Sequence, residues 1–258
     1  MPVTRRNLMK YGSTAAVMIG ASTILPYAAF AQSGAMEEDI YDTDNGEIAI
    51  IPVAHASFVM KTPSMVIYND PVGGADTYAG MPAPDLVLLT HEHGDHYNVE
   101  TLQGIVADNT QIIANPAVFE MLPEDLKSKA SAIANGDSTT VGDMPIDAIP
   151  AYNITEDRLK YHPQGRDNGY VLNIDGVRVY VAGDTEDIPE MRALTDIDIA
   201  FVPMNLPYTM DEEQAASAIN AFKPTYVYPY HYRDSDIDKF AGLVGDGVEV
   251  KRGPWYEG

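Results

Sequence analysis

The chain has 258 residues, of which 45% are hydrophobic, and this suits one sizeable domain or at most two small ones. It contains no cysteine, so disulfides and cysteine-based metal sites are excluded. The formal net charge of -22 repels phosphate backbones, and no basic cluster follows the first ten residues, which weighs against nucleic acid as a substrate or partner.

Residues 1–31 have the pattern of a removable targeting segment. Residues 4–10 (TRRNLMK) resemble the twin-arginine export consensus. Residues 11–25 are apolar but diluted by small and polar residues, whereas a membrane span needs about 20 mainly apolar residues. Residues 29–31 (AFA) predict cleavage before Gln32. We therefore expect a twin-arginine export signal, the twin-arginine translocase as a transient partner, and the periplasm as destination; an uncleaved anchor helix is the alternative.

The acidic residues 32–46 predict a loose leader, and the folded domain is expected at residues 47–258. Three strands come first, and residues 86–90 form a continuous apolar run typical of a strand buried on both faces. A hairpin follows around Asp175-Gly176, and Thr209 is expected to cap a helix with Glu212 three residues on. In chain order the predicted strands are 47–53, 57–61, 64–68, 86–90, 111–114, 138–141, 146–149, 169–174, 177–182, 199–203, 225–228 and 248–251, and the predicted helices are 98–107, 116–129 with an interruption at Pro123, 189–194, 209–222 and 236–243.

This order, a strand meander followed by alternating strands and helices, occurs twice along the chain. Two sheets packed face to face with helices outside would satisfy it, which predicts an α+β fold.

Metal-capable side chains gather directly after the apolar run 86–90. Residues two apart in extended chain point the same way, so His91 and His93 can hold one ion from one side. Gly94 allows a sharp turn that brings Asp95 and His96 towards a second ion. Imidazoles with a carboxylate and no thiolate favour zinc, with manganese or iron as alternatives. The competing interpretation is an exposed polar turn with chance histidines.

Two more chemical groups follow strands in the second half of the chain. Asp184 comes after the strand 177–182, and His231 after the strand 225–228. A carboxylate from that half could bridge two ions, and His231 could complete the shell of the second ion. Taken singly, Asp184 is more often a backbone-capping residue and His231 a satisfied buried histidine.

These positions together resemble the metallo-β-lactamase superfamily, over about residues 47–256. Shorter matches resemble the branch that contains the ascorbate-6-phosphate lactonase; they lie at His55-Ala-Ser-Phe, Asp70-Pro71, Ala151-Tyr-Asn153, Gly169-Tyr170, Pro207-Tyr-Thr-Met210 and Pro229-Tyr-His231. The resemblance implies a four-layer αββα sandwich.

The resemblance also implies roles for the residues that match. His91 and His93 correspond to ligands of the first metal, while Asp95, His96 and His231 correspond to ligands of the second, and Asp184 to the bridging carboxylate. The third histidine of the first metal is replaced by Asn153, and His162 is the imidazole nearby. Either His162 reaches in, or Asn153 ligates weakly, or the first site lacks a ligand; we prefer His162 because an amide oxygen is a poor zinc ligand.

Three other residues are candidates for supporting roles. His55 is expected either to face the substrate or ligands, or to be a packed histidine at a strand end. Asp70 is expected to orient a ligand imidazole. Tyr208 is a candidate for the substrate pocket, although packing is the safer default.

The function implied is hydrolysis of a small ester, lactone or phosphoester by a metal-bound hydroxide, with Asp95 and Asp184 as catalytic residues. The alternatives are a β-lactam hydrolase, a diiron redox enzyme and a non-catalytic metal-binding protein of the same fold. Diiron relatives carry Glu at the position of His93, which weighs against the redox alternative.

Overall fold

The computed structural model describes residues 38–256. The expected export signal, residues 1–31, lies outside the described residues, as does the first part of the expected leader. Within residues 38–256, no helix combines the length and the apolar character that crossing a membrane requires.

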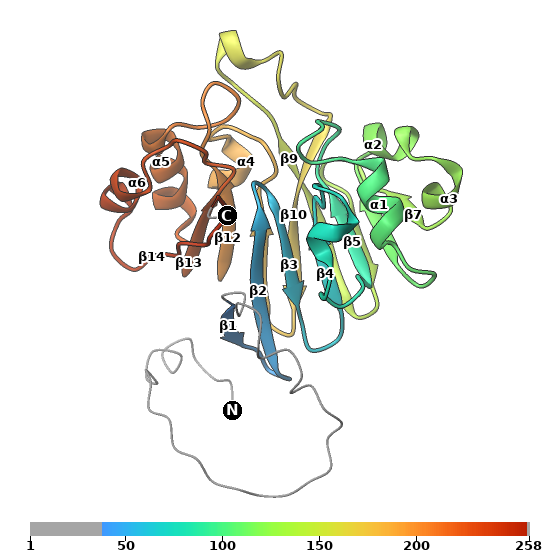
Figure 1. Cartoon of the computed structure of the whole chain (residues 1–258). Coiled ribbons are helices and arrows are strands. Elements are labelled where there is room, and N and C mark those ends of the chain that lie inside the picture. Colours follow the sequence, from blue (N-terminus) through green and yellow to red (C-terminus); the bar gives the residue numbers. More distant parts are fainter. Residues whose placement is uncertain (1–37, 257–258) are drawn as a thin grey trace, which may run out of the picture. The chain divides into compact units, whose positions relative to one another are not determined.

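Two seven-stranded sheets form the centre of the described part of the chain, and in each sheet the strands lie side by side in sequence order (Figure 1). In the first sheet β1 to β4 are antiparallel, and β4 to β7 are parallel. The second sheet repeats this plan, antiparallel from β8 to β11 and parallel from β11 to β14. The strands are β1 Asp39–Asp42, β2 Glu47–Ala54, β3 Ser57–Lys61, β4 Val66–Asn69, β5 Leu86–Leu89, β6 Gln111–Ala114, β7 Ala130–Ala132, β8 Ser138–Val141, β9 Met144–Ala151, β10 Asp167–Ile174, β11 Val177–Val181, β12 Ile199–Pro203, β13 Tyr226–Tyr230 and β14 Glu249–Val250.

Helices cover the outer face of each sheet, so the predicted αββα sandwich is confirmed (Figure 1). The largest core cluster lies between the sheets and joins residues such as Phe58 of β3 to Phe201 of β12. Two further clusters pack α1 to α3 on the first sheet and α4 to α6 on the second. The helices are α1 Val99–Ile105, α2 Pro116–Met121, α3 Glu124–Lys127, α4 Pro189–Arg192, α5 Glu212–Phe222 and α6 Ile237–Leu243, with short 3-10 turns η2 Ala75–Tyr78 and η3 Glu156–Arg158.

Local sequence accounts for the strands that carry the chemistry. β5 and β12 are buried at every position, as their continuous apolar runs predict. The turn between β10 and β11 places Asp175 and Gly176 at φ 46° and 85°, the backbone of a tight hairpin.

The expected loose leader is ordered where the structure describes it. Residues 39–42 form β1, which pairs with β2 at the edge of the first sheet. The hydroxyl oxygens of Tyr41 and Tyr228 lie 2.5 Å apart, and Tyr228 donates to Asp39 at 2.6 Å. β1 therefore contacts the second sheet as well, through side chains distant in sequence.

The predicted start of the helix 209–222 was wrong by two residues. Asp211 caps α5 and forms a capping box with Gln214. The Thr209 hydroxyl instead accepts a hydrogen bond from the backbone N–H of Asn205 at 2.8 Å, which closes the preceding loop.

Candidate metal centre

The first half of the site is a turn directly after β5. The backbone N–H groups of His96 and Tyr97 both donate to the carbonyl of His93, at 2.9 and 2.8 Å. This turn folds the chain back, so that the rings of His91 and His96 lie 4.0 Å apart although five residues separate them.

The second half comes from the ends of β11 and β13. Asp184 follows β11 after Gly183, which has a φ of 65°. A Cβ at Gly183 would lie 2.7 Å from the carbonyl oxygen of Asn168 and 3.2 Å from Thr90, so only glycine fits the close approach that aims Asp184 at the histidines. His231 follows β13 and has a φ of 50°.

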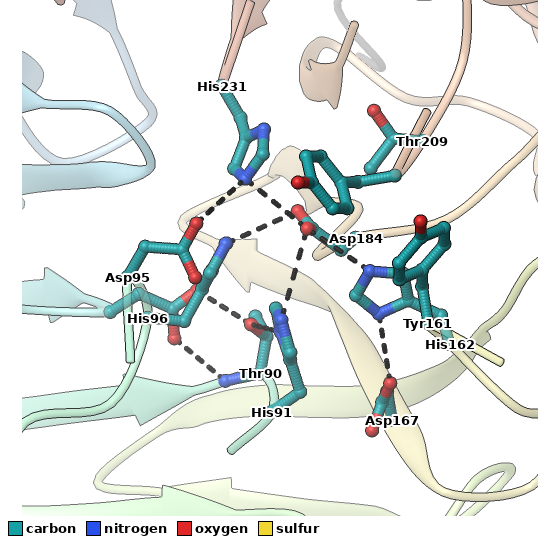
Figure 2. A network of polar contacts seen from close by, with 12 residues as sticks. Thr90, His91, Asp95, His96, Tyr161, His162, Asp167, Asp184, Thr209 and His231 are labelled. Carbon is teal, nitrogen blue, oxygen red and sulfur yellow. Dashed lines mark hydrogen bonds and ion pairs between the residues drawn. The ribbon is translucent and has the colours of Figure 1, made fainter. Parts of the chain in front are cut away.

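The structure brings the predicted residues together around Asp184 (Figure 2). One group that could hold a metal ion is His91, His93 and His162, and a second is His55, Asp95, His96 and His231. Asp184 lies between them. Its Oδ1 is 3.3 Å from His96 Nε2, and its Oδ2 is 3.3 Å from His231 Nε2, 3.4 Å from His162 Nε2 and 3.9 Å from His91 Nε2.

His162, and not Asn153, reaches the first group. The backbone N–H of Asn153 donates to the carbonyl of His162 at 2.8 Å, and its side-chain amide donates to Tyr208 and Arg158 carbonyls at 2.7 and 3.1 Å. Asn153 therefore braces the loop that carries His162.

Buried partners fix how three of the imidazoles point. Asp70 accepts from Nδ1 of His96 at 2.9 Å and from the hydroxyl of Thr90 at 2.6 Å. Because that hydroxyl gives its hydrogen to Asp70, it accepts from Nδ1 of His91 at 3.0 Å. A carboxylate oxygen of Asp167 lies 3.2 Å from Nδ1 of His162 and orients that ring as Asp70 orients His96.

This arrangement leaves metal-binding atoms facing one another without partners. With Nδ1 donating, Nε2 of a neutral imidazole presents a lone pair, and the Nε2 atoms of His91, His96 and His162 are buried without a hydrogen bond, as is Oδ1 of Asp184. Lone pairs and a carboxylate oxygen at 3.3–3.9 Å repel unless a cation lies among them. The residues present therefore fit one or two metal ions.

The pKa shifts of the cluster without metal agree with a site that binds a cation. Burial raises the pKa of Asp184, but His231, His96 and His162 outweigh this and hold the pKa below its usual value. Burial would lower the pKa of His96, yet the carboxylates of Asp184, Asp70 and Asp95 raise it to about 9. Burial, reinforced by neighbouring imidazoles, lowers the pKa of His91, which keeps that ligand neutral.

His55 lies inside the cluster. Its Nε2 is 3.0 Å from Asp95, its Nδ1 is 2.7 Å from the Tyr256 hydroxyl, and its ring centroid is 3.8 Å from that of His231. His55, Asp70 and His231 all have positive φ, an uncommon backbone conformation that gathers at functional sites.

Arg166, which the sequence analysis did not select, ties the first group together. It makes two hydrogen bonds to Asp167, at 2.6 and 2.9 Å, and donates to the carbonyl of Tyr161 at 3.0 Å. It also lies 2.7 Å from Glu92, the residue between His91 and His93. One guanidinium thus links the segments that carry all three imidazoles. The sequence signal that could have indicated this role of Arg166 is the presence of charged residues close to the candidate ligands.

Replacing Arg166 with glutamine is expected to weaken metal binding at the first group about 10–100-fold, because outer partners of ligands typically contribute that much. Competition with a chelating dye should show that metal bound at this group is released earlier than in the wild type. Arg192→Gln removes a comparable surface pair with Asp187, at 2.7 Å, and should leave metal binding unchanged. Equal loss from both groups would contradict a role confined to the first.

A buried carboxylate missed by the sequence analysis anchors the same loop. Glu186 is fully buried and accepts from the backbone N–H groups of Ile154 and Thr155 at 2.6 Å, and from Arg158 at 2.7 Å. Burial raises the pKa of Glu186, but the Thr155 and Ile154 amides and Arg158 lower it by more than burial raises it, so the carboxylate stays ionised. It follows Asp184 by two residues and so couples the loop to that carboxylate.

Comparison with known proteins identifies the family. A model described as the β-lactamase superfamily domain matches residues 50–231, most of the chain. The chain belongs to the metallo-β-lactamase superfamily. The UPF0173 metal-dependent hydrolase of Thermococcus onnurineus is 31% identical over 210 residues, covering 77% of this chain and 92% of the relative. The corresponding protein of Thermococcus kodakarensis is 29% identical with the same coverage. This member of the superfamily is therefore a metal-dependent hydrolase.

Solved structures agree with that assignment. A protein of Parabacteroides distasonis described as a metal-dependent hydrolase is 43% identical, with a TM-score of 0.78, over 84% of this chain and 98% of the other. The metallo-hydrolase Igni18 of Ignicoccus hospitalis shares the fold at 24% identity and a TM-score of 0.64, over 80% of this chain and 95% of the other.

Proposed function

We propose that this hydrolase acts in the periplasm on a small ester, lactone or phosphoester, with two zinc ions as its cofactor. The observation that carries the proposal is the set of unpartnered, buried imidazole nitrogens that converge on Asp184 from the turn after β5, the loop before β10 and the end of β13. A ligand set of imidazoles and carboxylates without thiolates suits zinc, and manganese or iron are its competitors.

Bound zinc supplies Lewis acidity and lowers the pKa of a coordinated water from 15.7 to about 7. The chain contributes position and charge. Asp184 contacts members of both groups, so its carboxylate would hold an ion at either of them. Asp95 has the most open position, with 43% of its side chain exposed, and can accept a hydrogen bond from the attacking water. Burial raises the pKa of Asp95, but the nearby imidazole of His231, at 3.6 Å, and the hydrogen bond with His55 lower it well below its usual value, so it stays an acceptor.

The substrate is tested with zinc-loaded mature protein and a panel of lactones, phosphodiesters and β-lactams. We expect turnover of at least one lactone or phosphodiester, and its loss in Asp95→Asn, which keeps the shape of the side chain and should keep the fold. Turnover of β-lactams alone would replace the proposed substrate class. Full activity in Asp95→Asn would remove the role of Asp95.

Metal analysis of the purified protein separates the cofactor proposals. Two equivalents of zinc or manganese support a hydrolase of this kind, iron supports redox chemistry, and no metal supports a binding protein.

Export rests on residues 4–10 and 29–31, which lie outside the described residues. Replacing Arg5 and Arg6 with lysine is expected to retain the protein in the cytoplasm, because the twin-arginine pair is the part of the signal that the translocase reads. Cell fractionation with an immunoblot measures the outcome, and a mature N-terminus at Gln32 would support cleavage. Unchanged periplasmic yield of the twin-lysine variant would exclude this route.

A further inference from the structure

Exposed hydrophobic side chains concentrate beside the metal centre. Within residues 38–256 the large hydrophobic side chains that remain exposed number eight, and four of them lie on two loops, residues 152–166, which include His162, and residues 204–210. These four are Ile154, Leu159, Leu206 and Tyr208, each 43–49% exposed. Single exposed hydrophobic residues are ordinary, but a group at one place marks a binding surface.

The two loops contact each other, and we treat the exposed hydrophobic side chains that they carry as one surface. The rings of Tyr161 and Tyr208 are 4.9 Å apart, the Asn153 amide donates to the carbonyl of Tyr208 at 2.7 Å, and Arg158 donates to the carbonyl of Thr209 at 3.2 Å. The buried Glu186 pairs with Arg158, and this ion pair, together with these contacts, fixes the two loops against each other. We name the surface formed by Ile154, Leu159, Tyr161, Leu206 and Tyr208 the apolar rim.

The apolar rim borders the reacting centre. Tyr161 directly precedes His162, whose Nε2 lies 3.4 Å from Asp184. Figure 2 shows Tyr161 and Thr209 on the side of Asp184 where His162 lies, and Asp95 on the opposite side. A substrate has its reacting bond beside Asp95 and Asp184. If the substrate is longer than the metal cluster, its remaining part therefore lies over the apolar rim.

Charge on these loops does not favour an anionic group. Arg158 is paired with Glu186, and Arg166 with Asp167 and Glu92. The remaining cation of residues 152–166 is Lys160, which lies over the ring of Tyr161 at 4.9 Å, and the same loop carries Glu156 and Asp157. The loop of residues 204–210 has no charged residue.

We propose that the substrate is a carboxylic ester or lactone carrying an uncharged alkyl or aryl substituent, which packs on the apolar rim while the carbonyl meets the metal cluster. This inference rests on the proposed hydrolase function and narrows its substrate class.

A series of γ-lactones with side chains of zero to four carbons tests this with zinc-loaded protein. Full burial of a methylene corresponds to about a fourfold gain in affinity. An open surface buries only part of each methylene, so kcat/KM should rise about twofold for each methylene added. The expected rise from γ-butyrolactone to γ-octalactone is roughly tenfold or more. The double variant Leu159→Ser/Leu206→Ser should flatten the series, lowering kcat/KM for γ-octalactone several-fold more than for γ-butyrolactone.

Met121→Ser/Leu243→Ser is the matched control, because these side chains are 52% and 42% exposed on α2 and α6. It should keep the wild-type dependence on chain length. A flat series in the wild type, an unflattened series in the rim variant, or equal flattening in the control would each overturn the proposal.

Binding without turnover separates this inference from the proposed function. The neutral dye Nile red should bind the wild type and the control more tightly than the rim variant, and 1-alkanols should displace it in order of chain length. If no lactone or ester is hydrolysed but this displacement holds, the proposed function fails and the rim stands as an apolar binding site. If lactones are hydrolysed but the dye binds all three proteins equally, the rim proposal fails alone.

Discussion

Asp184→Asn is expected to reduce hydrolysis about a thousandfold and to release bound metal. The substitution keeps the size of the side chain but removes the negative charge that lies among His91, His96, His162 and His231. Charge stabilisation by a metal is worth several kcal/mol, and each 1.36 kcal/mol is tenfold in rate. The measurement is kcat/KM with any substrate found in the panel, together with metal content after dialysis.

Asp187→Asn is the matched control, three residues further along the same loop. Asp187 pairs with the partly exposed Arg192 and belongs to neither group of metal-binding residues, so Asp187→Asn should change neither rate nor metal content. Circular dichroism should show both variants folded. Retention of two metal equivalents by Asp184→Asn would refute its bridging position.

Phe201→Ala should have the largest effect on stability among single core changes of this type. Phe201 is fully buried between the sheets, with its ring centroid 4.1 Å from that of Phe58 and 4.9 Å from that of Tyr228. Removing it leaves a cavity that both sheets line, and such changes cost about 3–5 kcal/mol of the free energy of unfolding. That is a large share of the roughly 5–15 kcal/mol typical of a domain.

Urea denaturation of metal-free protein measures this change. Phe119→Ala provides the comparison, because Phe119 is only half-buried on α2, and its loss should cost about 1 kcal/mol. Equal unfolding midpoints for the two variants would show that the contact between the sheets contributes less than its burial suggests.

The sequence predicted the sheet plan and most of the cluster because their signals are local. A buried run such as 86–90 and the Asp175-Gly176 turn determine a strand and a hairpin from a few neighbouring residues. His91 and Asp95 belong to one short motif, and Asp184 and His231 were found because each follows a strand.

The features that were missed depend on contacts between distant residues. β1 has only four residues, Ile40 and Tyr41 between two aspartates, and its stability comes from pairing with β2 and from Tyr228. Asp167 and Arg166 have no motif of their own; their role appears only when His162 and Glu92 lie beside them. Gly94 was expected to be needed for the turn, but its φ is not positive and nothing crowds its Cβ position, so the hydrogen bonds to His93 shape the turn instead.

The sequential strand order of the two sheets has a consequence for assembly. Every strand of the first sheet lies within residues 39–132, and every strand of the second within 138–250, so each sheet can form from one uninterrupted stretch of chain. The ligand positions are divided between those stretches: His91 and His96 belong to the first, and His162 and His231 to the second. A metal ion held as we propose is therefore a cross-link between two consecutively made halves. Its binding free energy adds to the free energy of docking them, since a ligand that needs both halves in place stabilises only the assembled state.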